Sequence, residues 1–92
     1  MLKQAGNQCR LAGNVTIDSV PGLLDQIRPM IQSGVDTLDC SGVLDVDSSA
    51  LGFLLACKRE ARQHKRNLTI TNLPASLLSL ASLYGIVESL AA

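Results

Sequence analysis

Hydrophobic and polar positions alternate with a period of two in several short segments of this chain, which predicts β-strands. The first two segments lie on either side of Gly6-Asn7, a turn pair, so we expect the chain to begin with a hairpin. A later strand should end in a turn at Ser41-Gly42. The expected strands are residues 2–6, residues 8–12 with 15–17 as a continuation or bulge, residues 35–43 and residues 68–71.

Three other segments have the 3.6-residue spacing of amphipathic helices. In the first, Ser19 or a neighbour is the expected cap, Pro21 suits the first helical position, and Gly34 lies where a helix usually stops. Pro29 lies inside this helix and should kink it. The second helix is expected from Ser48 to about Gln63, and the third from Pro74 to near Gly85, followed by a short apolar tail over 86–90. The expected inward positions are Leu23, Leu24, Ile27, Met30 and Ile31 in the first helix and Leu51, Leu54, Leu55 and Ala61 in the second. The third helix carries Leu77, Leu78, Ala81, Leu83 and Tyr84. The C-terminal apolar set, which is Leu80, Leu83, Tyr84, Ile86 and Leu90, is expected to be mostly core; the alternative is that one side of it belongs to an interface, because the helix is apolar over a wide arc.

Strands interleaved with helices predict an α/β fold in which the later strands run parallel. We expect a small mixed sheet of four to five strands with three main helices packed on it. The chain has 92 residues, which suits one domain, and we take residues 1–92 as a single unit.

Composition favours a domain that works by binding another protein. Eight Lys and Arg balance eight Asp and Glu, so there is no electrostatic case for nucleic acid or an anionic membrane as the main partner. Phe53 and Tyr84 are the only aromatic residues, which excludes the stacking platforms of single-strand binders. Hydrophobic residues make up 47% of the chain, so a small domain should leave some of them exposed for docking.

Cysteine and histidine usage argues against a disulfide framework or a metal site. The three cysteines lack CxxC spacing and His64 is the only histidine, so we expect reduced, mostly buried thiols, no metal and no cofactor. No run of about 18 apolar residues is present, and residues 1–11 do not have the character of a signal peptide. We therefore expect a soluble intracellular protein without direct membrane insertion.

The most informative segment is Leu44-Asp45-Val46-Asp47-Ser48-Ser49-Ala50-Leu51, between a strand and the best helix. Asp47 or Ser48 can cap that helix by accepting bonds from its first backbone N–H groups. In this interpretation, the polar residues of the segment form only a helix cap and a turn. Alternatively, the hydroxyls are exposed at the positive end of the helix dipole, where a phosphate on Ser48 would be stabilised and a partner could approach closely.

Two enzyme or metal motifs that this segment resembles do not fit. Asp45-Val46-Asp47 resembles the aspartates of haloacid-dehalogenase enzymes, but the further carboxylates these enzymes need are missing, since only Glu60 and Glu88 follow. A calcium-binding EF-hand counted from Asp45 would need Gly and Glu where Ala50 and Ala56 stand. No nucleophile–base pair or phosphate-binding glycine loop is present, so we expect no catalytic residues.

Residues 7–90 resemble a STAS domain, the fold of anti-sigma-factor antagonists and of the C-terminal parts of sulfate transporters. The resemblance is carried by Leu11-Ala12-Gly13-Asn14-Val15, by Thr37-Leu38-Asp39-Cys40-Ser41 and above all by Val46-Asp47-Ser48-Ser49-Ala50-Leu51. The last stretch is similar to the D-S/T-x-G-L helix start of the family, with Ala50 in place of the usual Gly. The run Leu80-Ala81-Ser82-Leu83-Tyr84-Gly85-Ile86 resembles the MlaB-type branch, whose members belong to a bacterial ABC system that moves phospholipids between the inner and outer membranes.

This resemblance implies a non-catalytic accessory subunit that maintains outer-membrane lipid asymmetry by binding and regulating a cytoplasmic ATPase subunit. The subunit would be cytoplasmic and peripheral on the inner membrane through that partner. The resemblance places partner binding at the helix start, Asp47, Ser48, Ser49, Leu51, Gly52 and Leu55. The alternative is an anti-sigma-factor antagonist that captures an anti-sigma kinase and is switched by phosphorylation of Ser48, although Ala50 weakens the inference of a kinase partner.

A basic cluster occupies the second half of the same helix: Lys58, Arg59, Arg62, Lys65 and Arg66. One interpretation is a solvated face that complements the negative end of the helix dipole. The other is a rim of charge that steers the domain onto an acidic patch of its partner or towards lipid headgroups. His64, among these cations, is expected at the surface.

Overall fold

The computed structural model describes residues 1–91, with the side chain of residue 91 left out. Within this part of the chain, four strands form one sheet in the order β1-β2-β3-β4. Strands β1 (Leu2–Ala5) and β2 (Gln8–Val15) pair antiparallel, with Ala5 opposite Gln8 across the two-residue turn at Gly6-Asn7. Strands β3 (Thr37–Val46) and β4 (Thr69–Thr71) run parallel to β2. The predicted mixed α/β sheet that begins with a hairpin is confirmed.

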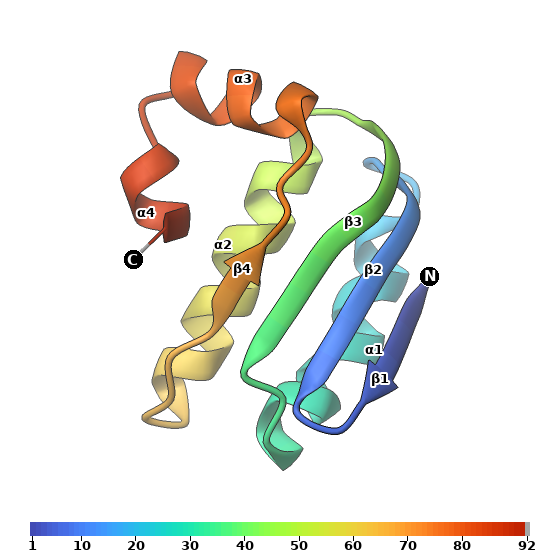
Figure 1. Cartoon of the computed structure of the whole chain (residues 1–92), viewed down its shortest axis with the longest axis vertical. Helices are drawn as coiled ribbons and strands as arrows, with labels where there is room; N and C mark the ends of the chain where they lie inside the picture. Colours follow the sequence, from blue (N-terminus) through green and yellow to red (C-terminus); the bar gives the residue numbers. More distant parts are fainter. Residues whose placement is uncertain (92) are drawn as a thin grey trace.

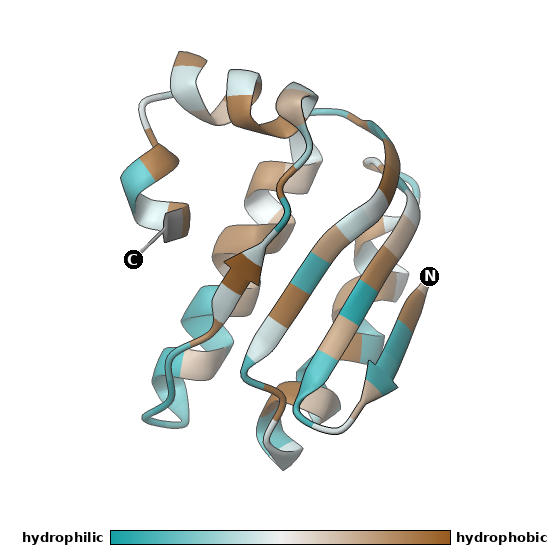
Figure 2. Cartoon of the chain, in the orientation of Figure 1, coloured by the Kyte–Doolittle hydropathy of each residue, from teal (hydrophilic) through white to brown (hydrophobic). Residues whose placement is uncertain are grey.

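Helices cover one face of this sheet and leave the other open (Figure 1). Helix α1 (Val20–Ser33) connects β2 to β3, and α2 (Ser49–Gln63) connects β3 to β4. Each helix runs back antiparallel to the strands because it joins two parallel strands, and Figure 1 shows both helices on the same face of the sheet. The core between the layers takes every second residue of β2, and Figure 2 shows the alternation of hydropathy along that strand. Its largest fully buried side chains include Phe53, Leu11, Ile27, Ile31, Leu38 and Leu54.

Strand β3 passes straight through Ser41 and Gly42, so the turn predicted at that pair is wrong. The pairing with β2 advances by two residues on β2 but by three on β3, first between Arg10 and Ala12 and again between Gly13 and Val15. These are β-bulges, which use the same polar and small residues as turns. At the first bulge the carboxylate of Asp39 accepts the backbone N–H of Ser41 at 2.9 Å and so replaces a ladder bond.

Gly42 allows β2 and β3 to approach closely at this bulge. A Cβ atom built on Gly42 would lie 2.8 Å from the Cβ of Ala12 and 3.2 Å from the carbonyl oxygen of Leu11. Neither of these two atoms can move away unless the backbone of β2 moves with it. A side chain at position 42 would therefore push the two central strands apart.

Three helices end in the same backbone motif. In α1 the N–H of Gly34 bonds to the carbonyl of Ile31 and that of Val35 to Met30, which is the Schellman pattern. Helix α2 closes in the same way but places Lys65, with φ 57°, at the left-handed position that glycine occupies in α1. The helix ends that the sequence predicts at Gly34 and Gly85 are confirmed. Helix α1 begins at Val20, one residue before Pro21, and continues through Pro29.

The C-terminal segment differs most from the expectation. Helix α3 (Ala75–Leu83) lies across the end of the sheet at which α2 begins, and α4 (Val87–Ala91) turns down beside α2 (Figure 1). Leu77, Ala81 and Leu90 are buried, but Leu83 is 78% exposed and Tyr84 is 58% exposed. The prediction that the C-terminal apolar set is mostly core is therefore wrong for Leu83 and Tyr84. Both lie at the end of α3, where the helix has passed beyond the sheet and has no layer to pack on.

Candidate partner-binding site

The predicted site lies at one end of the molecule, where β2 and β3 end and where α1 and α2 begin (Figure 1). This is where a parallel α/β sheet places the loops that follow its strands. Residues 16–19 connect β2 to α1, and Asp47 and Ser48 connect β3 to α2. The backbone N–H of Asp47 lies 3.4 Å from the carbonyl of Val15, so the two loops are side by side.

The carboxylate of Asp47 joins these two loops. Its Oδ1 accepts the backbone N–H of Ser49 at 2.8 Å, in the first turn of α2, and its Oδ2 accepts the backbone N–H of Ile17 at 3.0 Å. These donors, that of Ile17 above all, hold the pKa of the Asp47 carboxyl below its usual value. Asp47 therefore caps α2, as one of the two interpretations predicted, and in addition holds the neighbouring loop.

Ser48 is exposed and occupies the N-cap position of α2. Its hydroxyl makes no hydrogen bond to the helix backbone, since Asp47 serves that purpose. The side chain of Ser49 is half-buried. The two serines are thus not equivalent, and Ser48 is the hydroxyl presented to solvent at the positive end of the helix dipole.

Ser19 fixes the loop that carries Ile17. Its hydroxyl oxygen accepts the backbone N–H of Thr16 at 3.0 Å and lies 2.9 Å from the carbonyl oxygen of Asn14, to which it donates. Ser19 was predicted as a cap of α1. It has the N-cap position, but its side chain bonds to the loop before the helix and not to the helix N–H groups. The loop at residues 16–19 is consequently held from both sides, by Ser19 and by Asp47.

The remaining predicted site residues are distributed over three environments. Leu51 is only 4% exposed and belongs to the core, as predicted for an inward position of its helix, so its side chain is not accessible at the surface of the free chain. Gly52 is exposed one turn into α2, with open space where a Cβ would lie. Leu55 is half-buried in the wall of a groove of about 460 Å³ between α2 and α4. Ser48 and Gly52, four residues apart, are the accessible members of the set.

The sequence analysis missed two residues of this end. Ile17 is 68% exposed and Leu44 is 74% exposed. The sequence analysis placed Ile17 in a continuation or bulge of the second strand and Leu44 just after the third strand, and named neither as a contact residue. The side chain of Leu44 is exposed because the first bulge brings Val43 onto the core face, so that its neighbour faces the open side. The sequence holds only a weak signal that Ile17 is exposed: it is an isolated aliphatic residue that follows the strand ending at Val15 and precedes the polar residues Asp18 and Ser19.

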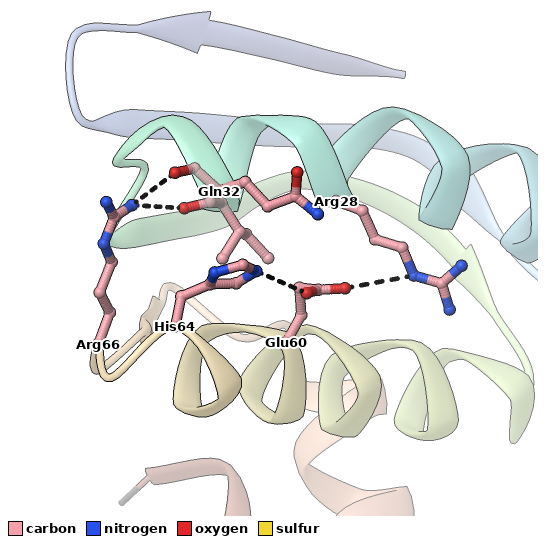
Figure 3. Close-up of polar contacts among 6 residues, drawn as sticks. Arg28, Gln32, Glu60, His64 and Arg66 are labelled. Carbon is pink, nitrogen blue, oxygen red and sulfur yellow. Dashed lines mark hydrogen bonds and ion pairs between the residues drawn. The ribbon is translucent and has the colours of Figure 1, made fainter.

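The basic cluster at the far end of α2 is partly structural (Figure 3). Arg66 donates to the carbonyl oxygens of Ile31 and Gln32, at 2.6 and 3.2 Å, and so satisfies the end of α1. Glu60 lies between Arg28 and His64, with contacts of 3.6 and 3.1 Å. Lys58 is buried, and burial lowers its pKa. The solvated-face interpretation therefore does not hold for Lys58, whereas Arg66 is exposed but has its guanidinium held at the end of α1. His64 is at the surface, as expected.

The three cysteines are free and buried, as predicted. Burial raises the pKa of Cys40 and of Cys57 to about 12, so neither thiol is a nucleophile. Within residues 1–91, no three His, Cys, Asp or Glu side chains gather as a metal site would require. No helix in the same range is long and apolar enough to cross a membrane.

Comparison with known proteins identifies the fold. The family described as "Mlab, STAS domain" matches residues 2–91. Among solved structures, the unphosphorylated anti-sigma factor antagonist SpoIIAA is similar at 20% identity, with a TM-score of 0.67 over 90% of this chain and 81% of that one. A putative anti-sigma factor antagonist from Thermotoga maritima is similar at 12% identity, with a TM-score of 0.77 over 99% of this chain and 82% of the other. The phosphorylated form of SpoIIAA, from Bacillus, is similar at 20% identity, with a TM-score of 0.65 over 94% and 83% of the two chains. No curated protein sequence matches.

Proposed function

Since this chain belongs to the STAS domain family, in the group described as MlaB, we propose that it is a non-catalytic accessory subunit of a phospholipid-transporting ABC complex. It binds the cytoplasmic ATPase subunit through the start of α2 and works at the cytoplasmic face of the inner membrane. The observation that carries this proposal is the exposed, uncommitted hydroxyl of Ser48 at the tip of a helix whose capping is done by Asp47.

The arrangement is suited to binding. Because Asp47 already satisfies the first turn of α2, a partner that contacts Ser48 does not have to compete with the helix for its hydroxyl. Gly52 leaves open space one turn further on, so that a partner backbone can approach the helix closely. The bound subunit would favour the ATPase conformation for which it has the higher affinity, and its effect is limited by that difference in affinity.

The test is binding of the purified chain to the ATPase subunit of a phospholipid-transporting ABC complex from the same organism. Ser48→Arg places charge and bulk at the tip of α2 and should abolish binding. Gln63→Arg makes the same kind of change at the exposed far end of α2 and should leave binding intact. If Ser48→Arg binds as well as the unmodified chain, the start of α2 is not the docking surface.

A second function is supported by the comparison structures, whose names include anti-sigma factor antagonists in unphosphorylated and phosphorylated form. In that case phosphorylation of Ser48 would add about −2 charge at the contact and release an anti-sigma kinase. Incubation with such a kinase and intact-mass analysis separates the two proposals. One phosphate that is lost in Ser48→Ala supports the antagonist, and no phosphate favours the ATPase subunit.

A further inference from the structure

Two large aliphatic side chains are exposed beside the proposed contact. Ile17 lies in the loop after β2 and Leu44 lies near the end of β3. The register Val15↔Val46 brings the ends of these two strands together, so both residues lie at the end of the sheet where α2 begins. A small domain with a well-filled core gains nothing from exposing two such side chains at one end. Exposed aliphatic residues in a polar surround are typical of contact surfaces.

The Ile17 side of this surface is preorganised. The backbone N–H of Ile17 is held by Asp47, and Ser19 bonds to the backbone on either side of Val15. Leu44 lies within β3, whose pairing with β2 continues to Val46. A partner therefore binds side chains whose backbone is already ordered, and little conformational entropy is lost there on binding.

Charge gives this end its chemical character. The segments 11–27 and 40–57, which build it, contain four Asp and no Lys or Arg, whereas 58–66 contains five of the eight basic residues of the chain. Asp47 is engaged in hydrogen bonds, but Asp18 and Asp45 are exposed and form no ion pair within the described residues. The molecule is neutral overall and yet acidic at the end that carries Ile17 and Leu44.

We propose that Ile17 and Leu44 are the apolar anchors of the docking surface around Ser48, and that the ATPase surface they enter is an apolar recess bordered by Lys or Arg. This inference rests on the proposed function for the identity of the partner. An acidic rim around apolar anchors selects a basic rim, which speeds encounter and excludes acidic or anionic surfaces.

The experiment measures binding of the ATPase subunit, and separately of an anti-sigma kinase from the same cell, to the full chain and its variants. Ile17→Ser and Leu44→Ser should each weaken binding about tenfold or more, because a buried aliphatic side chain is lost from the contact. The control Leu83→Ser removes an equally exposed leucine at the end of α3 and should not change affinity.

Charge reversal tests the second half of the inference. Asp45→Lys should slow association, and the association rate of the unmodified chain should fall as salt is raised. Asp36→Lys, on an exposed residue before β3 at the opposite end of the sheet, is the matched control. Thermal melts of every variant show whether the fold is retained, as expected for exposed positions.

Each outcome decides a different point. If the ATPase binds and Ser48→Arg abolishes binding, but Ile17→Ser, Leu44→Ser and Asp45→Lys bind normally, the anchors are wrong and the proposed function stands. If the kinase binds in place of the ATPase and loses affinity with the Ile17 and Leu44 variants, the surface is right and the proposed function is wrong. If neither protein binds the unmodified chain, both are wrong.

Discussion

Gly42 offers a sharp test of how the two central strands pack. Gly42→Ala adds a Cβ that would lie 2.8 Å from the Cβ of Ala12, closer than two carbons can approach, and the backbone atoms around it leave no room to yield. Overpacking of this kind costs about 1–3 kcal/mol. The lower entropy of an alanine in the unfolded chain returns about 0.4–1 kcal/mol. We expect a net loss of about 1–2 kcal/mol.

Gly52→Ala is the matched control, because the same change is made where the structure has open space around an exposed helical position. There alanine should stabilise the fold by about 0.5–1 kcal/mol through helix propensity. In thermal melts followed by circular dichroism, each kcal/mol shifts the midpoint by roughly 4–8 °C in a domain of this size. The two variants should therefore shift the midpoint in opposite directions. A Gly42→Ala protein as stable as the unmodified chain would refute the close approach of β2 and β3.

Three further predictions concern protonation and backbone conformation. Backbone N–H donors, above all the N–H of Ile17, lower the pKa of Asp47 in the folded state. The stability that the ionised carboxylate contributes is therefore present above the pKa of Asp47 in the unfolded chain, and it is lost as the pH falls through the pKa of Asp47 in the folded chain. The free energy of unfolding of Asp47→Asn, measured by urea melts, should therefore fall less steeply as the pH is lowered than that of the unmodified chain. An unchanged pH dependence would contradict the hydrogen bond between Asp47 and Ile17. Lys65→Gly should stabilise the chain by about 1 kcal/mol, because Lys65 occupies the left-handed region, and an unchanged melting midpoint would show that this conformation is not costly. Burial raises the pKa of Cys40 and Cys57 to about 12, so the unfolded state loses these protons first and stability should fall as the pH rises above about 8.5. A thiol reagent should label both only on unfolding, and labelling in the native state would count against their burial.

The sequence was sufficient for the order of elements, because each rests on local signals. The turn pair at Gly6-Asn7, the stop at Gly34 and the helical spacing of Leu23, Ile27 and Ile31 all depend on residues within a few positions of one another. The structure confirms the hairpin, the end of α1 and the buried face of that helix. The parallel strands followed from the alternation of strands and helices.

Features set by the approach of distant segments were not predictable. Ser41-Gly42 has the composition of a turn, and only the position of Ala12 on the neighbouring strand explains why it is a bulge. Tyr84 was assigned to the core with the rest of the C-terminal apolar set, whereas its exposure depends on how far α3 extends beyond the sheet. In the candidate site, the contact of Asp47 with Ile17 joins residues thirty positions apart, and no local pattern contains it.

The hydrogen bond between Asp47 and Ile17 also determines how binding data on variants of the helix-start motif must be interpreted. If Asp47→Ala abolishes partner binding, the loss does not make Asp47 a contact residue, because the variant also releases the loop that carries the Ile17 anchor. The amide of Ile17 distinguishes the two cases, since its hydrogen exchange can be measured without the partner. Faster exchange of that amide in Asp47→Ala, together with weaker binding, means that Asp47 acts by positioning the loop. Unchanged exchange with lost binding means that the partner touches the carboxylate itself, and the hydrogen bond to Ile17 would then be dispensable for the surface.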